Sequence, residues 1–323
     1  MLHPSTFPEV IEASQLQVEP LAWAAGNALL VAASLARVGA ILFKRTSLDT
    51  PEKLEAFARL TSVEIPDFKE ESSPRTSVKG HVATSTDYPH NLPIQFHSEY
   101  SYAHRWPMKL YFCCFRPPAV GGETPICDTR RVLANMKPAT RNAFERAGVL
   151  YVRNYRANVG VSWQRAFRTE ERRRVERICE EAGIEWEWRP EGVLRTRQSG
   201  EAIVPHPKTG EPVWFNHAFF FNVHALEPHD VRRLALSFPE DDPLSTNTFF
   251  GDGCPIGVEI VEELRSLYEQ AAVRNRWDTG DLLLIDNMMS AHGRAAFKGK
   301  REILVVMADA CPREALRGGA RFG

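Results

Sequence analysis

Hydrophobic residues in the N-terminal part of the chain fall into blocks whose spacing and length indicate two helices and a strand. Residues 22–37 have a helical composition, and a glycine separates them from the apolar run 40–43, which has the length of a short strand. A second helix is predicted over 51–60, where Thr50 can cap the first turn and a proline suits the next position. The order helix, strand, helix is therefore expected here.

Strand patterns dominate the chain beyond residue 95. The segment 109–115 is almost wholly apolar and ends at paired prolines and paired glycines, after which 124–127 resumes. Helical composition returns at 129–148 and 163–183. Further strands are predicted at 202–204, 213–215, 282–285 and 303–307. The mixture predicts an α+β fold in which helices are inserted among strands.

No linker divides the chain. Internal repeats, low-complexity tracts and Gly/Ser-rich connections are absent from the sequence, so residues 1–323 are predicted to form a single domain. Within it, the helical segments suggest an insertion at roughly 129–185. The polar stretch 70–90 contains Ser-Ser-Pro and Thr-Ser-Thr runs, which are typical of loops, and we expect it to be mobile.

Charge and cysteine content narrow the classes of partner and compartment. Lys and Arg number 40 against 41 Asp and Glu, so no whole-chain field favours nucleic acid. Six cysteines include neither a CxxC pair nor a zinc-like cluster with histidine, which argues against a disulfide framework or a structural zinc site. A cytoplasmic protein without a nucleic-acid partner is therefore expected.

The apolar stretch 21–43 is the one segment that could imitate a membrane span. Asn27 and Arg37 interrupt it, and two glycines weaken a continuous helix, so we interpret it as core. The residues before it include Glu9 and Glu12 and no Lys or Arg, which disfavours a signal peptide. Neither membrane insertion nor export is expected.

The first candidate for chemistry is His97-Ser98-Glu99. On an extended strand, residues i and i+2 share a face, so the imidazole of His97 and the carboxylate of Glu99 could meet one cation. Such a pair also arises by chance as a surface His and Glu in a polar segment. The pair therefore needs a third ligand.

That third ligand is suggested by the segment 280–292, in which a buried strand runs into polar Asp286-Asn287 and then presents His292 beyond its end. Two histidines and one carboxylate on one face of a divalent ion form the facial triad of non-haem iron(II) oxygenases, which leaves three positions for a bidentate 2-oxo acid and O2. Zinc hydrolases use similar sets, so a cosubstrate pocket is needed to distinguish them.

Arg301 supplies a candidate for that pocket. It lies nine residues beyond His292 and just before the apolar run 303–307, so its guanidinium is expected to face inward. A planar guanidinium can pair both oxygens of the distal carboxylate of 2-oxoglutarate, which a lysine would not reproduce. Thr124 could add a hydroxyl, and Arg294 is the rival anchor.

Several ordered motifs together resemble the taurine dioxygenase and clavaminate synthase superfamily, over most of the chain. The motifs are His97-Ser-Glu-Tyr-Ser-Tyr102, Trp106-Pro-Met-Lys-Leu110, Gly121-Gly-Glu-Thr-Pro-Ile-Cys-Asp128 and Asp286-Asn-Met-Met-Ser-Ala-His-Gly-Arg294, with Arg301. The chain is most similar to the branch containing the syringomycin-pathway aspartate hydroxylase. Segments 152–155, 161–164, 194–198, 214–216 and 250–256 carry that closer likeness.

The resemblance implies a double-stranded β-helix, or jelly roll, with flanking helices. It also implies Fe(II), 2-oxoglutarate as cosubstrate and O2. By motif, His97, Glu99 and His292 would be the iron ligands, Arg301 would pair with the C5 carboxylate of 2-oxoglutarate, and Thr124 would support it. Many relatives have Asp in place of Glu99, and halogenating members have Gly or Ala there, so Glu99 argues against halogenation.

The resemblance implies an amino acid or amino-acid derivative as substrate, either free or tethered to a carrier protein, in natural-product biosynthesis. Asn154, Tyr155, Arg197 and Asn216 lie in the family-like motifs and could bind it, although structural roles are equally consistent with the sequence. Hydroxylation is the expected reaction; desaturation, epoxidation and cyclisation are alternatives. A non-catalytic jelly roll that binds a metal and a 2-oxo acid, or a zinc hydrolase, are further alternatives.

Overall fold

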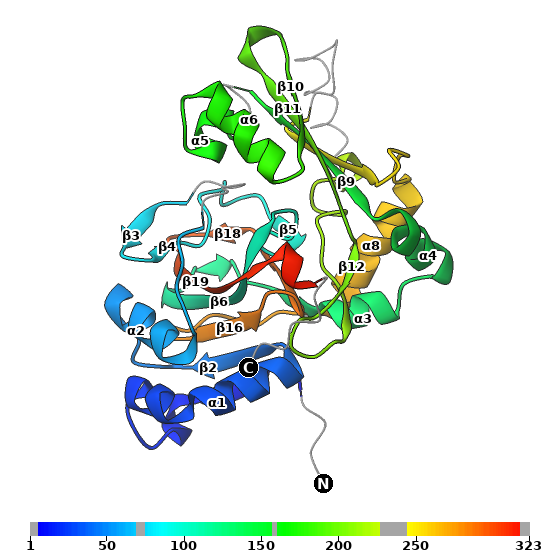
Figure 1. Ribbon diagram of the computed structural model, residues 1–323. Coiled ribbons are helices and arrows are strands. Elements are labelled where there is room, and N and C mark those ends of the chain that lie inside the picture. Colours follow the sequence, from blue (N-terminus) through cyan, green and yellow to red (C-terminus); the bar gives the residue numbers. More distant parts are fainter. Residues whose placement is uncertain (1–5, 69–74, 157–159, 227–243, 317–323) are drawn as a thin grey trace.

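A computed structural model describes residues 6–68, 75–156, 160–226 and 244–316 (Figure 1). Its largest sheet has seven strands in the spatial order β1-β2-β16-β6-β19-β4-β3. These strands are β1 (Glu9–Glu12), β2 (Ala40–Lys44), β16 (Leu282–Asp286), β6 (Arg105–Arg116), β19 (Glu302–Pro312), β4 (Val82–Thr84) and β3 (Ser77–Lys79). The long antiparallel pair β6 and β19 forms the centre of the sheet.

Two four-stranded sheets accompany it. One has the order β15-β8-β17-β5, from Ala272–Val273, Ile126–Asp128, Ser290–Arg294 and Ile94–His97. The other has the order β10-β11-β9-β14, from Glu185–Trp188, Leu194–Gly200, Val149–Tyr155 and Thr246–Phe250. Two short pairs complete the strands, β12 (Ile203–Pro205) with β13 (Pro212–Trp214) and β18 (Phe297–Lys298) with β7 (Val120–Gly121). The expected α+β class is confirmed.

The helices lie around these sheets. They are α1 (Pro20–Val38), α2 (Pro51–Thr61), α3 (Thr129–Ala134), α4 (Pro138–Ala147), α5 (Trp163–Phe167), α6 (Arg172–Glu181) and α8 (Val258–Ala271). Both α1 and α2 pack on one face of the seven-stranded sheet through an apolar cluster shared with β2, β6, β16 and β19. The Thr50 side chain accepts a hydrogen bond from the backbone N–H of Lys53, so it caps α2 as expected.

Successive side chains along the central strands point to opposite faces of this sheet, so every second residue lies on the face away from α1 and α2. Leu110, Phe112 and Ile285 belong to a second cluster that also contains Ile126 of β8. The seven-stranded sheet therefore packs against the sheet of β15, β8, β17 and β5. The candidate site lies near the edge of the interface between these two sheets.

Helix α1 is long and apolar enough, by length and composition alone, to cross a membrane. A core helix passes the same test. In this fold α1 packs on α2 and β2, and the buried residues Ala24, Val31 and Leu35 lie on its inner face. The expected core role of 21–43 holds for β2 and for this inner face of α1, whereas only 28% of the apolar window of α1 is buried and Leu29 and Leu30 are exposed.

Each of the two predicted helical regions forms two helices rather than one. Residues 129–148 form α3 and α4, with a break before Pro138, and 163–183 form α5 and α6. Strand β9 lies between these pairs, so the segment 129–185 is not wholly helical. In the stretch 70–90, β3 and β4 are paired strands rather than loop, and 69–74 lie outside the described residues.

Candidate metal centre

Three side chains from separate parts of the sequence converge on one point. Ligand atoms of His97, Glu99 and His292 all lie within 4.8 Å of one another. Oε2 of Glu99 is 3.9 Å from Nε2 of His97 and 3.9 Å from Nε2 of His292. The three groups are largely shielded from water, and their spacing suits ligands around a single ion.

Strand pairing brings the two histidines together. β17 runs antiparallel to β5, and His292 is the direct partner of His97 across the pair. Directly opposed residues point to the same face of a sheet, and the two imidazole centroids are 4.4 Å apart. His292 lies past the end of β16, as expected, and it is the middle residue of a further strand, β17, which the sequence did not predict.

Glu99 reaches the site from a turn. Strand β5 ends at His97, so the alternation of an extended strand does not place the carboxylate. Instead, the amide of Asn287 accepts a hydrogen bond from the Glu99 backbone N–H at 2.7 Å and donates one to its carbonyl at 2.8 Å. This two-way contact holds the turn. Asn287 was noted in the sequence only as a polar residue after a strand.

The histidines are in the form that binds a metal. The Nδ1 of His97 lies 2.9 Å from the carbonyl of Gln95, which fixes the proton on Nδ1 and leaves the Nε2 lone pair directed at the site. Burial lowers the pKa of His97, although Glu99 opposes this, and burial with repulsion from His97 lowers the pKa of His292 well below its usual value. Both imidazoles are therefore neutral at pH 7, as a divalent ion requires.

A cation already neighbours the carboxylate. Nη2 of Arg75 lies 2.6 Å from Oε2 of Glu99, and the two side chains are only 10% and 6% exposed. The second nitrogen, Nη1, is 3.5 Å from the sulfur of Met307. Sequence reasoning missed Arg75, because it lies in a polar stretch with no motif around it.

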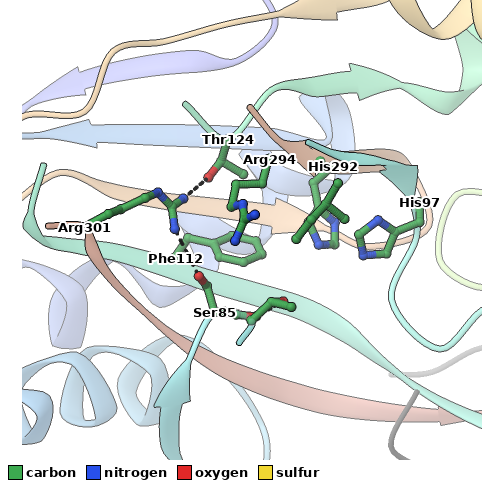
Figure 2. A pocket seen from close by; sticks show the side chains of 10 residues that line it. Ser85, His97, Phe112, Thr124, His292, Arg294 and Arg301 are labelled. Carbon is green, nitrogen blue, oxygen red and sulfur yellow. Dashed lines mark hydrogen bonds between the residues drawn. The ribbon is translucent and has the colours of Figure 1, made fainter. Parts of the chain in front are cut away.

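Arg301 lies at the other end of a cavity that leads to the histidines (Figure 2). Its Nη2 donates to Thr124 Oγ1 and its Nη1 to Ser85 Oγ, both at 3.2 Å, while Nε donates to the Gly122 carbonyl. The cavity is small, with a volume of about 20 Å³, and Phe112 contributes to its lining. Arg301 and Thr124 are thus brought together as expected. Ser85 was missed.

The charge on Arg301 survives its burial. Burial first, and Arg294 next, lower the pKa of Arg301 to about 10, so the guanidinium is protonated at neutral pH. Arg294, the alternative candidate for binding 2-oxoglutarate, instead donates hydrogen bonds to the carbonyls of Tyr88, Pro89 and Leu92. Arg294 therefore ties the chain before β5 to β17, whereas Arg301 faces two hydroxyls that could share an anion.

Aromatic rings surround the histidines. Phe220 stacks on His97 with centroids 4.5 Å apart, and Phe112 lies 5.1 Å from His292. A further buried histidine, His217, has its centroid 5.9 Å from that of His97, and its Nδ1 lies 2.5 Å from Ser101 Oγ. Burial, followed by the charge of His97, lowers the pKa of His217 well below its usual value. The centre is thus walled by neutral rings.

The four residues expected to bind substrate are not gathered in one place. Asn154 bonds to the Leu244 carbonyl and accepts from Arg195, and Asn216 bonds to the Ala202 carbonyl and accepts from the Ala218 N–H. Both amides therefore hold backbone and neighbouring side chains. Arg197 is exposed on β11, whereas Tyr155 lines a cavity beside β9.

Comparison with known proteins agrees with this geometry. The family model described as taurine catabolism dioxygenase TauD, TfdA family matches residues 4–307. The dapdiamide synthesis protein DdaC of Enterobacter agglomerans is 34% identical over 275 residues, covering 85% of this chain and 83% of that protein. A clavaminate synthase-like protein of Arabidopsis thaliana is 29% identical, covering 82% and 80%.

Solved structures show the same fold at low identity. PvcB from Pseudomonas aeruginosa superposes with a TM-score of 0.56 and 15% identity, covering 94% of this chain and 87% of that one. Another structure of PvcB is described as an Fe, alpha-ketoglutarate dependent oxygenase from an isonitrile synthetic pathway. The likeness extends over nearly the whole fold.

Proposed function

Because the chain belongs to the taurine catabolism dioxygenase TauD, TfdA family and is an iron(II)- and 2-oxoglutarate-dependent oxygenase, we propose that it hydroxylates an unactivated C–H bond of an amino acid or amino-acid derivative. The observation that carries this proposal is the convergence of His97, Glu99 and His292 within 4.8 Å. In our proposal these three residues hold the iron. Their neutral imidazoles and single carboxylate suit an Fe(II) ion.

When bound, the iron and 2-oxoglutarate together activate O2 for oxidation of the substrate, and 2-oxoglutarate leaves as succinate and CO2. In our proposal, Arg301 binds the distal carboxylate of 2-oxoglutarate, with Ser85 and Thr124 as hydroxyl neighbours. Buried Phe112 gives the cavity an apolar wall beside His292. Glu99 occupies the position at which chloride would have to bind in a halogenating relative.

We also propose that residues 1–323 form one oxygenase domain built on a double-stranded β-helix, formed by the seven-stranded sheet and the sheet of β15, β8, β17 and β5. The cluster shared by these sheets supports the proposal. The segment around β9, α5 and α6 would be an insertion in that domain, and the stretch 70–90 a mobile cover for the site. A cytoplasmic location fits the six cysteines, none of which forms a disulfide with another described residue.

The substrate is proposed to be an intermediate of natural-product biosynthesis, free or tethered to a carrier protein. The likeness to DdaC, a dapdiamide synthesis protein, supports the biosynthetic setting. Helix α6 presents exposed Arg173 and Arg174, which could contact an acidic carrier. Arg172 has a structural contact instead, because its guanidinium carbon lies 4.6 Å from the centroid of the Trp188 ring.

A substrate screen tests the proposed function. Free amino acids and carrier-tethered aminoacyl groups are supplied with Fe(II), 2-oxoglutarate and O2, and succinate and product mass are measured together. A product heavier by one oxygen atom supports hydroxylation or epoxidation, and a mass loss of two hydrogens indicates desaturation or cyclisation. His97→Ala and His292→Ala should abolish both signals.

An anaerobic spectrum separates the rival classes. Iron(II) and 2-oxoglutarate bound together should give a weak visible charge-transfer absorption in the wild-type protein, and His292→Ala should remove it. A zinc hydrolase would give no such absorption. A non-catalytic binding protein would give the absorption but release no succinate with any substrate, which would contradict the proposal.

A further inference from the structure

Helix α1 is apolar on its outer side as well as on the side that packs in the core. No charged residue occurs between Glu19 and Arg37, yet only 28% of the most apolar window of the helix is buried. A helix that is apolar all round is normally covered on all sides. Figure 1 shows α1 at the outer edge of the molecule, beyond β2. Its outer side therefore lacks a cover among the described residues.

The exposed apolar residues of this helix form one continuous surface, which we call the α1 face. Its members are Ala22, Ala25, Gly26, Leu29, Leu30 and Ala33. They recur three or four residues apart, so they lie on one side of the helix, and they continue across the kink at Asn27. Leu29 is 87% exposed and Leu30 56%. Contiguous exposed apolar residues mark interaction surfaces, whereas single ones do not.

A groove between α1 and β1 widens this face on the side of Leu30. It has a volume of about 120 Å³, and its apolar lining comes from Ile11, Trp23, Leu30, Val31 and Ile41. One water molecule needs only about 10–15 Å³, so the groove has room for an apolar side chain. The polar residues that line it satisfy one another, because Ser34 and Arg37 both donate to the Glu9 carboxylate. An apolar occupant is therefore favoured.

The charges at the two ends of α1 match a second copy of this chain. Glu19 and Arg37 have opposite signs, and each lies nine residues from Ala28. If two copies of α1 pack antiparallel about a two-fold axis near Ala28, Glu19 of each copy meets Arg37 of the other. The same arrangement sets Leu30 opposite Gly26, and nothing lies within 4 Å of a Cβ added at Gly26. The face is therefore complementary to itself.

The end residues have groups with which to pair across such an axis. Among the described residues, the guanidinium of Arg37 contacts Glu9 and Ser34, and both contacts use Nη2. The carboxylate of Glu19 accepts from the Ser47 hydroxyl through Oε2. Nη1 of Arg37 and Oε1 of Glu19 can therefore form the pair between copies without breaking these contacts.

A membrane surface matches the α1 face less well. Helices that lie on membranes carry Lys and Arg along their polar side, which attract anionic lipids. Within α1 the one basic residue is Arg37, which is already paired with Glu9, and Glu19 adds a negative charge at the other end. An acidic carrier protein would likewise find no basic residue among the six members of the face.

We propose that the α1 face is the contact surface of a symmetric homodimer in which two copies of α1 pack antiparallel. One helix face with its adjoining groove is small beside the roughly 800 Å² per partner of a standard interface. The dimer should therefore be reversible and depend on concentration. This inference goes beyond the proposed function and does not depend on iron or 2-oxoglutarate, so either can fail without the other.

Sedimentation equilibrium of the full chain tests the dimer. The protein is measured between about 1 µM and about 1 mM, the range in which weak complexes dissociate, and in reducing buffer because Cys254 is exposed. The wild type should pass from monomer to dimer. Leu29→Glu and Leu29→Lys should each raise the dissociation constant at least about tenfold, because both copies lose apolar burial and like charges meet near the axis.

Mixing the two variants tests the two-fold arrangement and excludes misfolding as the cause. Position 29 is next to the proposed axis, so an equimolar mixture of Leu29→Glu and Leu29→Lys brings opposite charges together. The mixture should associate more tightly than either variant alone. Val258→Glu and Val258→Lys are matched controls on α8, which lies well away from α1 (Figure 1), and they should keep the wild-type dissociation constant.

Four results would overturn the proposal. They are a wild type that stays monomeric throughout, a dimer that the Leu29 variants leave unchanged, a mixture that recovers no association, and binding to lipid. For the last of these, the wild type is centrifuged with vesicles of phosphatidylcholine and phosphatidylglycerol. Co-sedimentation that Leu29→Glu abolishes would assign the α1 face to a membrane surface, whereas wild type that stays in the supernatant supports the dimer.

Discussion

Two arginines near the proposed iron site differ in what their guanidinium groups contact. Arg301 faces the hydroxyls of Ser85 and Thr124, whereas the terminal nitrogens of Arg294 are used by three backbone carbonyls. We therefore expect Arg301→Met to weaken 2-oxoglutarate binding by roughly 10- to 100-fold, as expected for loss of a charge-assisted contact. Anaerobic titration with 2-oxoglutarate, followed by the charge-transfer absorption, measures this affinity.

The matched variant Arg294→Met should act mainly on stability. Tyr88, Pro89 and Leu92 are exposed residues, so water can replace the lost donors, and the free energy of unfolding should fall by about 1 kcal/mol in chemical denaturation. Arg301→Lys, which keeps the charge, should recover part of the 2-oxoglutarate affinity. A larger loss of 2-oxoglutarate affinity in Arg294→Met than in Arg301→Met would reverse the two roles.

Arg75 is expected to affect metal affinity, because it contacts the same oxygen of Glu99 that faces both histidines. A guanidinium beside a carboxylate repels an incoming divalent ion, so Arg75→Met should bind Co(II) at least about tenfold more tightly. The same change leaves a buried carboxylate without its cation, so the protein without added metal should lose about 3 kcal/mol of unfolding free energy.

Titration with Co(II) and denaturation of the chelator-treated protein measure these two effects of Arg75→Met. Arg75→Lys preserves the charge and should resemble the wild type in both. Weaker Co(II) binding by Arg75→Met would instead mean that Arg75 holds Glu99 in its binding position, which would contradict the competition argued above.

At the scale of single elements, the close pairing of β17 with β5 determines whether the two histidines meet. A Cβ added at Gly293 would lie 2.7 Å from the Ile94 carbonyl oxygen, which is backbone and cannot rotate away. Gly293→Ala should therefore push the strands apart, reduce the unfolding free energy by about 1–3 kcal/mol and weaken metal binding. Denaturation and Co(II) titration measure the two effects.

Gly26→Ala is the control for this steric argument. Gly26 lies in α1 with nothing within 4 Å of an added Cβ, so alanine should leave metal binding unchanged and stabilise the helix by up to about 1 kcal/mol. Unchanged metal affinity in Gly293→Ala would show that the pairing of β17 and β5 tolerates the added methyl group.

The elements that sequence reasoning found are those whose own composition defines them. Helix α2, with its Thr50 cap, and the apolar strands β6, β16 and β19 lie within a few residues of the predicted segments. Strands β9 and β11 were missed because polar residues occur on both faces of each strand, which conceals the period of two. Amphipathic α8 was also missed.

The site residues also divide into those that a local sequence pattern identifies and those that it does not. His97, Glu99, His292, Arg301 and Thr124 were identifiable by motif, and the structure brings the first three together and places Thr124 against Arg301. Asn154 was expected to bind substrate, whereas its amide contacts the Leu244 carbonyl and Arg195. Which side chains of a strand are covered by neighbouring segments is decided by tertiary packing, which no local pattern in the sequence reports.

At the scale of the whole molecule, the proposed iron site would connect segments that are distant in the sequence. His97 and Glu99 precede the segment that contains β9, while His292 follows it, and Arg301 leads into the central strand β19. Because a metal that binds only the folded chain stabilises it by mass action, Mn(II) at about 100 times its dissociation constant should add about 2.7 kcal/mol of unfolding free energy.

For a chain of this size, that gain corresponds to a rise of roughly 5 °C in Tm. Adding 2-oxoglutarate with Mn(II) should raise Tm further, because its proposed partner Arg301 and the proposed metal ligands come from different segments that it would join. His292→Ala should abolish both increments, whereas Arg301→Met should abolish only the second. A rise in Tm with 2-oxoglutarate that persists in Arg301→Met would show that the cosubstrate is anchored elsewhere, even if the metal site is correctly assigned.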